Sequence, residues 1–150
     1  MSPSLKTHLL ALAAGLLVAV TAQAADPKPE VGPNKGKLIG QPPAQAEALI
    51  SPEGILTITF LDAGLKPSAP GDRSLKVFAQ LDAGRQPIEM AAKENALVST
   101  APLPKPEGYM LVVQSRAGAD AKPTNSRFKY AMHICSGCKL PEYACPCTEH

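Results

Sequence analysis

Turn-forming residues divide this chain into short segments, and their spacing restricts the folds it can adopt. From Ala44 onward, clusters of Gly, Pro, Asp and Asn interrupt short apolar runs at intervals of roughly eight to twelve residues. Short strands with regular turns are typical of all-β sandwiches, so we expect an immunoglobulin-like β-sandwich of about seven strands. The chain has no Trp and no Cys before residue 135, so it lacks the Cys-Trp-Cys core of antibody domains.

Alternation of apolar and polar residues marks the expected strands. In 55–61, Leu56, Ile58 and Phe60 alternate with two threonines, which predicts a strand with one buried face. Residues 87–97 contain good helix formers, but the run is too short for a convincing helix. The other expected strands cover 46–50, 75–81, 87–92, 96–101, 109–114 and 127–134, and 38–39 is a candidate edge strand within the segment before them.

No catalytic constellation is visible within these strands and turns. The sequence shows no Ser/His/Asp set, no phosphate-binding glycine loop and no metalloprotease helix. Most carboxylates fall at expected turns, where acidic side chains commonly accept hydrogen bonds from the backbone. We therefore predict that the protein is not an enzyme. The carboxylates considered are Glu47, Glu53, Asp62, Asp72, Asp82 and Glu89.

Residues 1–24 have the three parts of a secretory signal peptide: a segment carrying Lys6, an apolar run over 9–20, and small residues before a cleavage site. As a helix the apolar run would span ~18 Å, which is short of a ~30 Å hydrocarbon core. We expect a periplasmic or secreted protein with no membrane attachment after cleavage. The mature chain would have a Pro- and Gly-rich extended lead-in (25–43), a β-sandwich domain (44–134) and a Cys-rich tail (135–150).

Charge and aromatic content argue against nucleic acid as a partner. Loss of Lys6 with the signal segment leaves fourteen Lys and Arg residues against thirteen Asp and Glu residues. The basic residues are scattered along the sequence, and six aromatic residues are available for stacking on bases.

All four cysteines lie within thirteen positions, as C-x2-C-x6-C-x-C. The first pair has the spacing of a zinc knuckle, in which a tight turn directs two thiolates at one ion. The second pair can complete a site of four thiolates, and such soft ligands suit zinc or copper(I). We therefore predict a metal site built from Cys135, Cys138, Cys145 and Cys147. His133 and His150 are spare candidates, although a lone His on a strand is more often solvated.

Two alternatives remain open for the tail. An exported chain with an even number of cysteines is often cross-linked by disulfides. A disulfide that joins one cysteine of the first pair to one of the second is geometrically easier than a Cys145–Cys147 disulfide around Pro146. A disulfide across C-x2-C would stabilise the fold by only roughly 2 kcal/mol, whereas a structural zinc ion contributes ~10–16 kcal/mol to folding. The C-x2-C spacing also occurs in thiol oxidoreductases, but there it begins a helix in a thioredoxin-like fold.

The tail P-E-Y-A-C-P-C after C-S-G-C resembles a group of small exported bacterial proteins of uncharacterised function that end in C-x2-C…E-Y-A-C-x-C. The stretch 32–40 (GPNKGKLIG) is also similar to the G-P-H-G-G opening of periplasmic proteins associated with heavy-metal efflux. Asn34 and Lys35 replace the His and a Gly here, which removes the residue most relevant to a metal. The first resemblance implies a fold and export but no known activity.

The leading hypothesis from the sequence is a periplasmic protein that binds or delivers zinc or copper(I) through its tail. The alternative is a structural or interaction module, in which the sandwich binds a protein partner and two disulfides pin the tail.

Overall fold

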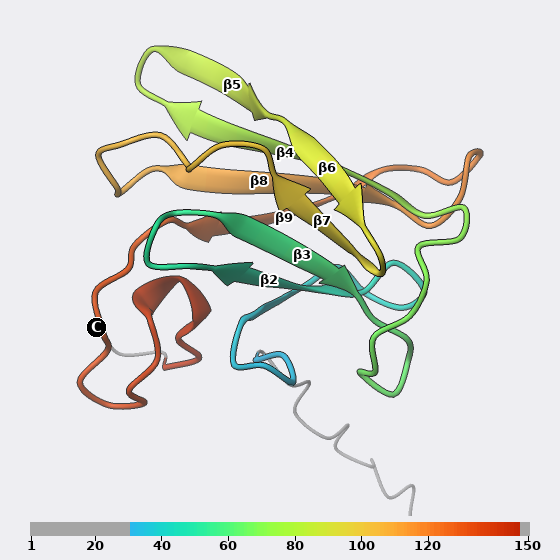
Figure 1. The fold of residues 1–150 in the computed structure, drawn as a ribbon, viewed down its shortest axis with the longest axis horizontal. Helices are drawn as coiled ribbons and strands as arrows, with labels where there is room; N and C mark the ends of the chain where they lie inside the picture. Colours follow the sequence, from blue (N-terminus) through green and yellow to red (C-terminus); the bar gives the residue numbers. More distant parts are fainter. Residues whose placement is uncertain (1–30, 148–150) are drawn as a thin grey trace, which may run out of the picture.

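Two antiparallel sheets lie face to face in this protein (Figure 1). The computed structural model describes residues 31–147. The expected signal peptide at 1–24, the first part of the lead-in and His150 lie outside the described residues. Among the described residues, no helix has the length and apolar character needed to cross a membrane.

The sheets contain five and four strands. The five-stranded sheet has, in spatial order, β1 (Lys37–Ile39), β2 (Ala46–Ile50), β3 (Leu56–Phe60), β7 (Ala96–Ser99) and β6 (Met90–Lys93). The four-stranded sheet has β5 (Gly84–Ile88), β4 (Ser74–Leu81), β8 (Met110–Arg116) and β9 (Thr124–Lys129). The predicted all-β sandwich is confirmed, with nine strands in the described residues rather than about seven.

Burial follows the alternation expected from the sequence. In β3 the apolar side chains of Leu56, Ile58 and Phe60 are buried, whereas the intervening threonines are half-buried on the outer side. The inward-facing residues of β8, in the opposite sheet, belong to the same hydrophobic core. The largest fully buried apolar side chains are Tyr130, Leu56, Ile58, Leu61, Leu103, Leu111, Val77 and Val113.

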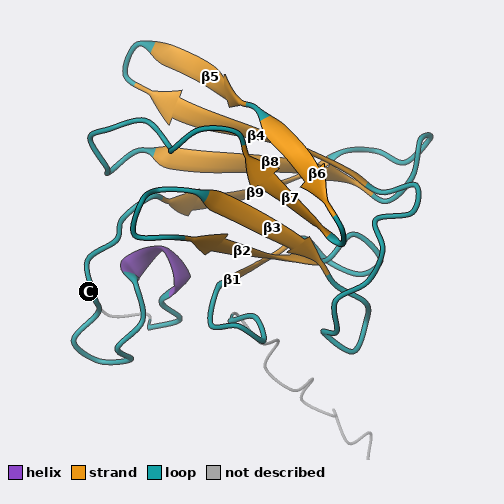
Figure 2. Cartoon of the chain, viewed as in Figure 1, coloured by secondary structure: helices purple, strands orange, loops and turns teal. Residues whose placement is uncertain are grey.

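One of the two additional strands is β1, and the other arises because one segment changes sheets. β5 pairs with β4, so that Pro87 lies opposite Phe78, and after Glu89 the chain continues as β6, which pairs with β7 in the other sheet. Figure 2 shows β5 running directly into β6. Pro87 is tolerated because β5 is an edge strand. The segment is therefore neither one strand over 87–92 nor a helix over 87–97.

The last strand ends earlier than the sequence predicted. β9 stops at Lys129, opposite Met110 at the start of β8, rather than continuing to Ile134. Tyr130 still bonds the segment before β8, with its N–H donating to the Tyr109 carbonyl at 2.8 Å. Beyond it the backbone bonds the tail, where the Tyr143 N–H donates to the Ala131 carbonyl at 3.1 Å. Ile134, at the end of the expected strand, is 59% exposed. The prediction was wrong because the segment after Tyr130 pairs with the tail, a contact that local periodicity does not reveal.

Candidate metal centre

The C-terminal tail closes one open side of the sandwich. Its single helical turn, η1 (Glu142–Ala144), packs against β1 of one sheet and β9 of the other. Tyr143 in this turn is buried, its ring lies 6.3 Å from that of Phe128, and its hydroxyl accepts a 3.0 Å hydrogen bond from the Ile50 N–H. The segment between Cys135 and Cys147 is thus anchored to the core through its middle.

A tight turn shapes the first cysteine pair. The Cys135 N–H donates to the Leu140 carbonyl at 2.9 Å, and the Lys139 N–H donates to the Cys135 carbonyl at 3.0 Å. Lys139 adopts the left-handed conformation (φ 61°) that reverses the chain after Cys138. A Cβ atom at Gly137 would make ordinary van der Waals contact with the Cys147 sulfur at 3.5 Å, so Gly137 lies beside the sulfurs. This is the knuckle that the C-x2-C spacing predicted.

The structure brings all four cysteine sulfurs together. The Sγ atoms lie within 4.8 Å of one another. Cys138 Sγ is 3.3 Å from Cys145 Sγ, and Cys135 Sγ is 4.0 Å from Cys147 Sγ. These distances exceed the ~2.05 Å of a disulfide. A tetrahedral ion with Zn–S bonds of about 2.3 Å places its sulfurs about 3.8 Å apart, so the cluster has nearly the size of a four-thiolate site.

The four thiols do not share one electrostatic environment. Hydrogen bonds from the Cys138 backbone N–H, the Cys145 thiol and the Gly137 N–H lower the pKa of Cys135 to about 6. Burial raises the pKa of Cys145 to about 12. Thiolates this close repel one another, so a bound cation is what allows all four to ionise together. Cys135 is buried and the other three are half-buried, which leaves the cluster within reach of solvent.

The histidine considered as a spare ligand is not part of the cluster. The Nε2 atom of His133 lies 3.2 Å from a carboxylate oxygen of Glu142, and its side chain is 67% exposed. This contact joins the segment just before the tail to the helical turn η1. The metal-ligating group found among the described residues consists of the four cysteines.

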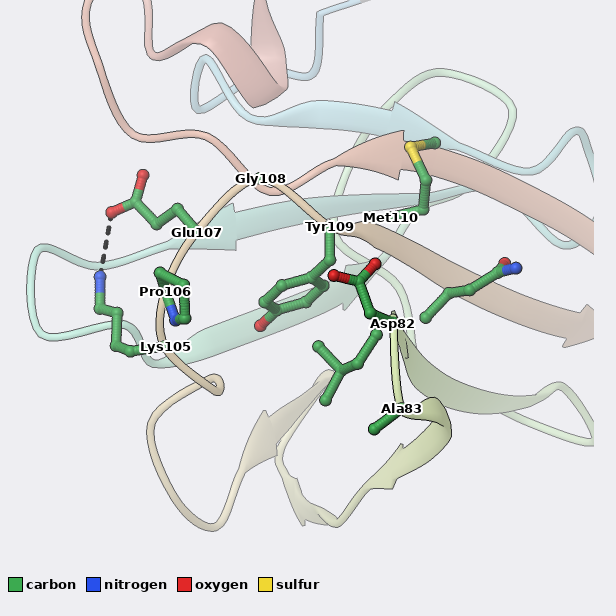
Figure 3. Close-up of a pocket in the computed structure, with 10 residues that line it drawn as sticks. Asp82, Ala83, Lys105, Pro106, Glu107, Gly108, Tyr109 and Met110 are labelled. Carbon is green, nitrogen blue, oxygen red and sulfur yellow. Dashed lines mark hydrogen bonds and ion pairs between the residues drawn. The ribbon is translucent and has the colours of Figure 1, made fainter.

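A second concave region lies at one end of the sandwich, between the β4–β5 turn and the segment before β8 (Figure 3). This cleft has a volume of about 710 Å³. Lys105 donates to Glu107 at 2.9 Å and to the Tyr130 hydroxyl at 3.2 Å, and the Tyr109 hydroxyl donates to the Pro104 carbonyl at 3.0 Å. These groups bond one another and do not present a nucleophile beside a base, so the cysteine cluster is the stronger candidate site.

Comparisons of this chain with protein-family models, with curated proteins and with solved structures find no match. The geometry of the cysteine cluster is therefore what supports a function.

Proposed function

We propose that this is an exported protein that binds one metal ion through Cys135, Cys138, Cys145 and Cys147. The observation that carries the proposal is the convergence of their four sulfur atoms within 4.8 Å. The C-x2-C turn and the C-x-C pair, held together by the buried turn η1, form a set of donors that suits a single ion. The signal-peptide character of residues 1–24 supports export.

The donor set favours zinc, with copper(I) as the other candidate. Four sulfurs at near-tetrahedral separations match the coordination that zinc adopts in closed sites. A closed site of four protein ligands keeps no position for water or substrate. The role that follows is binding or delivery of the ion rather than turnover.

The same geometry supports one alternative, in which the tail is pinned by two disulfides. Two cross-pairs that oxidation would join are Cys138 with Cys145, whose sulfurs lie 3.3 Å apart, and Cys135 with Cys147, at 4.0 Å. In an oxidising compartment a bound metal would protect the thiols from this reaction. The alternative makes the protein a structural or interaction module.

One preparation distinguishes these functions. The full chain, without an affinity tag, is expressed in a Gram-negative host, recovered from the periplasmic fraction, and assayed together for metal content and free thiols. We expect about one metal ion per chain and thiols that react only after a chelator removes the ion. Metal-free protein whose thiols appear only after reduction would refute the proposal in favour of the disulfide module. Catalysed reduction of insulin would instead assign a thiol oxidoreductase.

A further inference from the structure

The outer face of the four-stranded sheet gathers basic residues that are far apart in sequence. The four strands contain five Lys and Arg residues and no Asp or Glu. All five are exposed and belong to the positions that point away from the core. We refer to this surface as the basic face; its cations are Lys76, Arg85, Arg116, Arg127 and Lys129.

Strand register places two of these cations, Arg85 and Arg127, at a shallow hollow. Arg85 lies opposite Gln80, and Arg127 lies opposite Val112, which is the neighbour of Phe78 on β4. The hollow has a volume of about 310 Å³. Its lining combines two guanidinium groups with three amide side chains and an apolar floor; the residues are Arg85, Arg127, Gln80, Gln114, Asn125 and Val112.

The cations of this face have no carboxylate partner among residues 31–147. The ion pairs found in that part of the chain join Lys105 to Glu107 and His133 to Glu142, both outside the basic face. Arg85 stacks on the Phe78 ring, with its guanidinium carbon 3.6 Å from the ring centroid. Stacking holds the side chain in place and leaves the edge of the guanidinium free to donate hydrogen bonds.

Three arginines and a methionine on this face are residue types enriched at protein interfaces. The methionine, Met110, is 37% exposed beside Gln80. The cations reach across all four strands, a width of about 14 Å at ~4.8 Å per strand, so one small anion cannot engage them together. Amide side chains between the cations suit the backbone of an extended peptide.

We infer that the basic face binds an acidic, extended segment of a partner protein, whose carboxylates pair with Arg85 and Arg127. Val112 is buried, and Phe78 is half-buried beneath the Arg85 guanidinium, so neither offers a protruding apolar side chain to insert into a lipid surface. This favours a protein segment over an anionic membrane as the occupant. The site is separate from the cysteine cluster and does not depend on the proposed metal function.

The probe for this inference is a short synthetic peptide in which Glu alternates with Ser, titrated into the ¹⁵N-labelled full-length protein at low salt. We expect amide shifts confined to β4, β5, β8 and β9, and weaker binding as salt is added. The double variant R85Q/R127Q should bind about tenfold more weakly because two charge-assisted contacts are lost. Its matched control is K66Q/K93Q, which removes the same charge from exposed positions elsewhere.

Unchanged affinity in the control, together with loss in R85Q/R127Q, supports the inference. An equal loss of peptide affinity in both double variants would show that binding responds only to net charge, and would overturn the inference. Equal affinity for a Gln-Ser peptide, or no shifts at all, would also overturn it. Inorganic phosphate that produces the full set of shifts would replace it with a small-anion site. Binding to phosphatidylglycerol vesicles without binding to the peptide would replace it with a membrane surface.

Discussion

The Tyr143 hydroxyl accepts a 3.0 Å hydrogen bond from the backbone N–H of Ile50, joining the cysteine tail to β2 across 93 positions of sequence. β1 pairs with β2 only as far as Ala48, so the Ile50 N–H would otherwise be buried at an unpaired part of the strand edge. The tyrosine therefore completes the sheet and at the same time anchors the candidate metal centre.

Tyr143→Phe should lower the free energy of unfolding by about 1–3 kcal/mol, because it leaves the buried Ile50 N–H without an acceptor. Tyr109→Phe is the matched control, since its hydroxyl bonds the Pro104 carbonyl, which is on a half-buried residue that water can reach. Denaturant unfolding of the two variants measures the difference. Equal effects would contradict an anchoring role for Tyr143.

Replacing any one of the four cysteines with Ser should weaken metal binding, because a closed tetrahedral site needs every ligand. Ser136→Ala, which lies between two ligands and changes no sulfur, should retain the ion. Metal content after dialysis against a competing chelator measures the effect. The chelated Cys138→Ser protein should then show three reactive thiols; one reactive thiol would indicate a surviving disulfide between Cys135 and Cys147.

Metal affinity should fall with decreasing pH, and the fall should steepen below about pH 6. Above that pH the Cys135 thiol, whose pKa is lowered to about 6, is already ionised, whereas Cys145, with a pKa raised to about 12, keeps its proton until metal binds. Below it, Cys135 is protonated too, so binding displaces one more proton. Calorimetry in buffers of different ionisation enthalpy counts these protons. A constant count between pH 5 and pH 7.5 would contradict the lowered pKa.

Gly32→Ala should lower the free energy of unfolding by about 1–3 kcal/mol through overpacking. A Cβ atom there would overlap the Glu47 carboxylate, which is fully buried and accepts 2.8 Å hydrogen bonds from the backbone N–H groups of Asn34 and Gly36. Gly118→Ala is the control, because nothing lies within 4 Å of its Cβ position. The midpoint of thermal unfolding should be lower for Gly32→Ala than for Gly118→Ala. Similar midpoints would show that the loop around Gly32 accommodates the methyl group without loss of stability.

Local patterns in the sequence were sufficient for the all-β fold class and for the turn at the first cysteine pair. Alternation in 56–60 predicted the buried face of β3 because a strand repeats every two residues, whatever its partner. The C-x2-C turn also forms within a few residues, so its spacing predicted the knuckle at Cys135 and Cys138. The turn residues around Asp82 predicted the break between β4 and β5.

Tertiary structure decided what depends on distant partners. The segment after Tyr130 leaves the sheet and bonds the tail, as in the hydrogen bond from the Tyr143 N–H to the Ala131 carbonyl, and the alternation in 130–134 does not predict that partner. Basic residues that look scattered in the sequence form one face because register aligns strands up to about fifty positions apart, as with Phe78 and Arg127. The second cysteine pair meets the first because Tyr143 is buried against the sandwich, a contact between segments that only folding brings together.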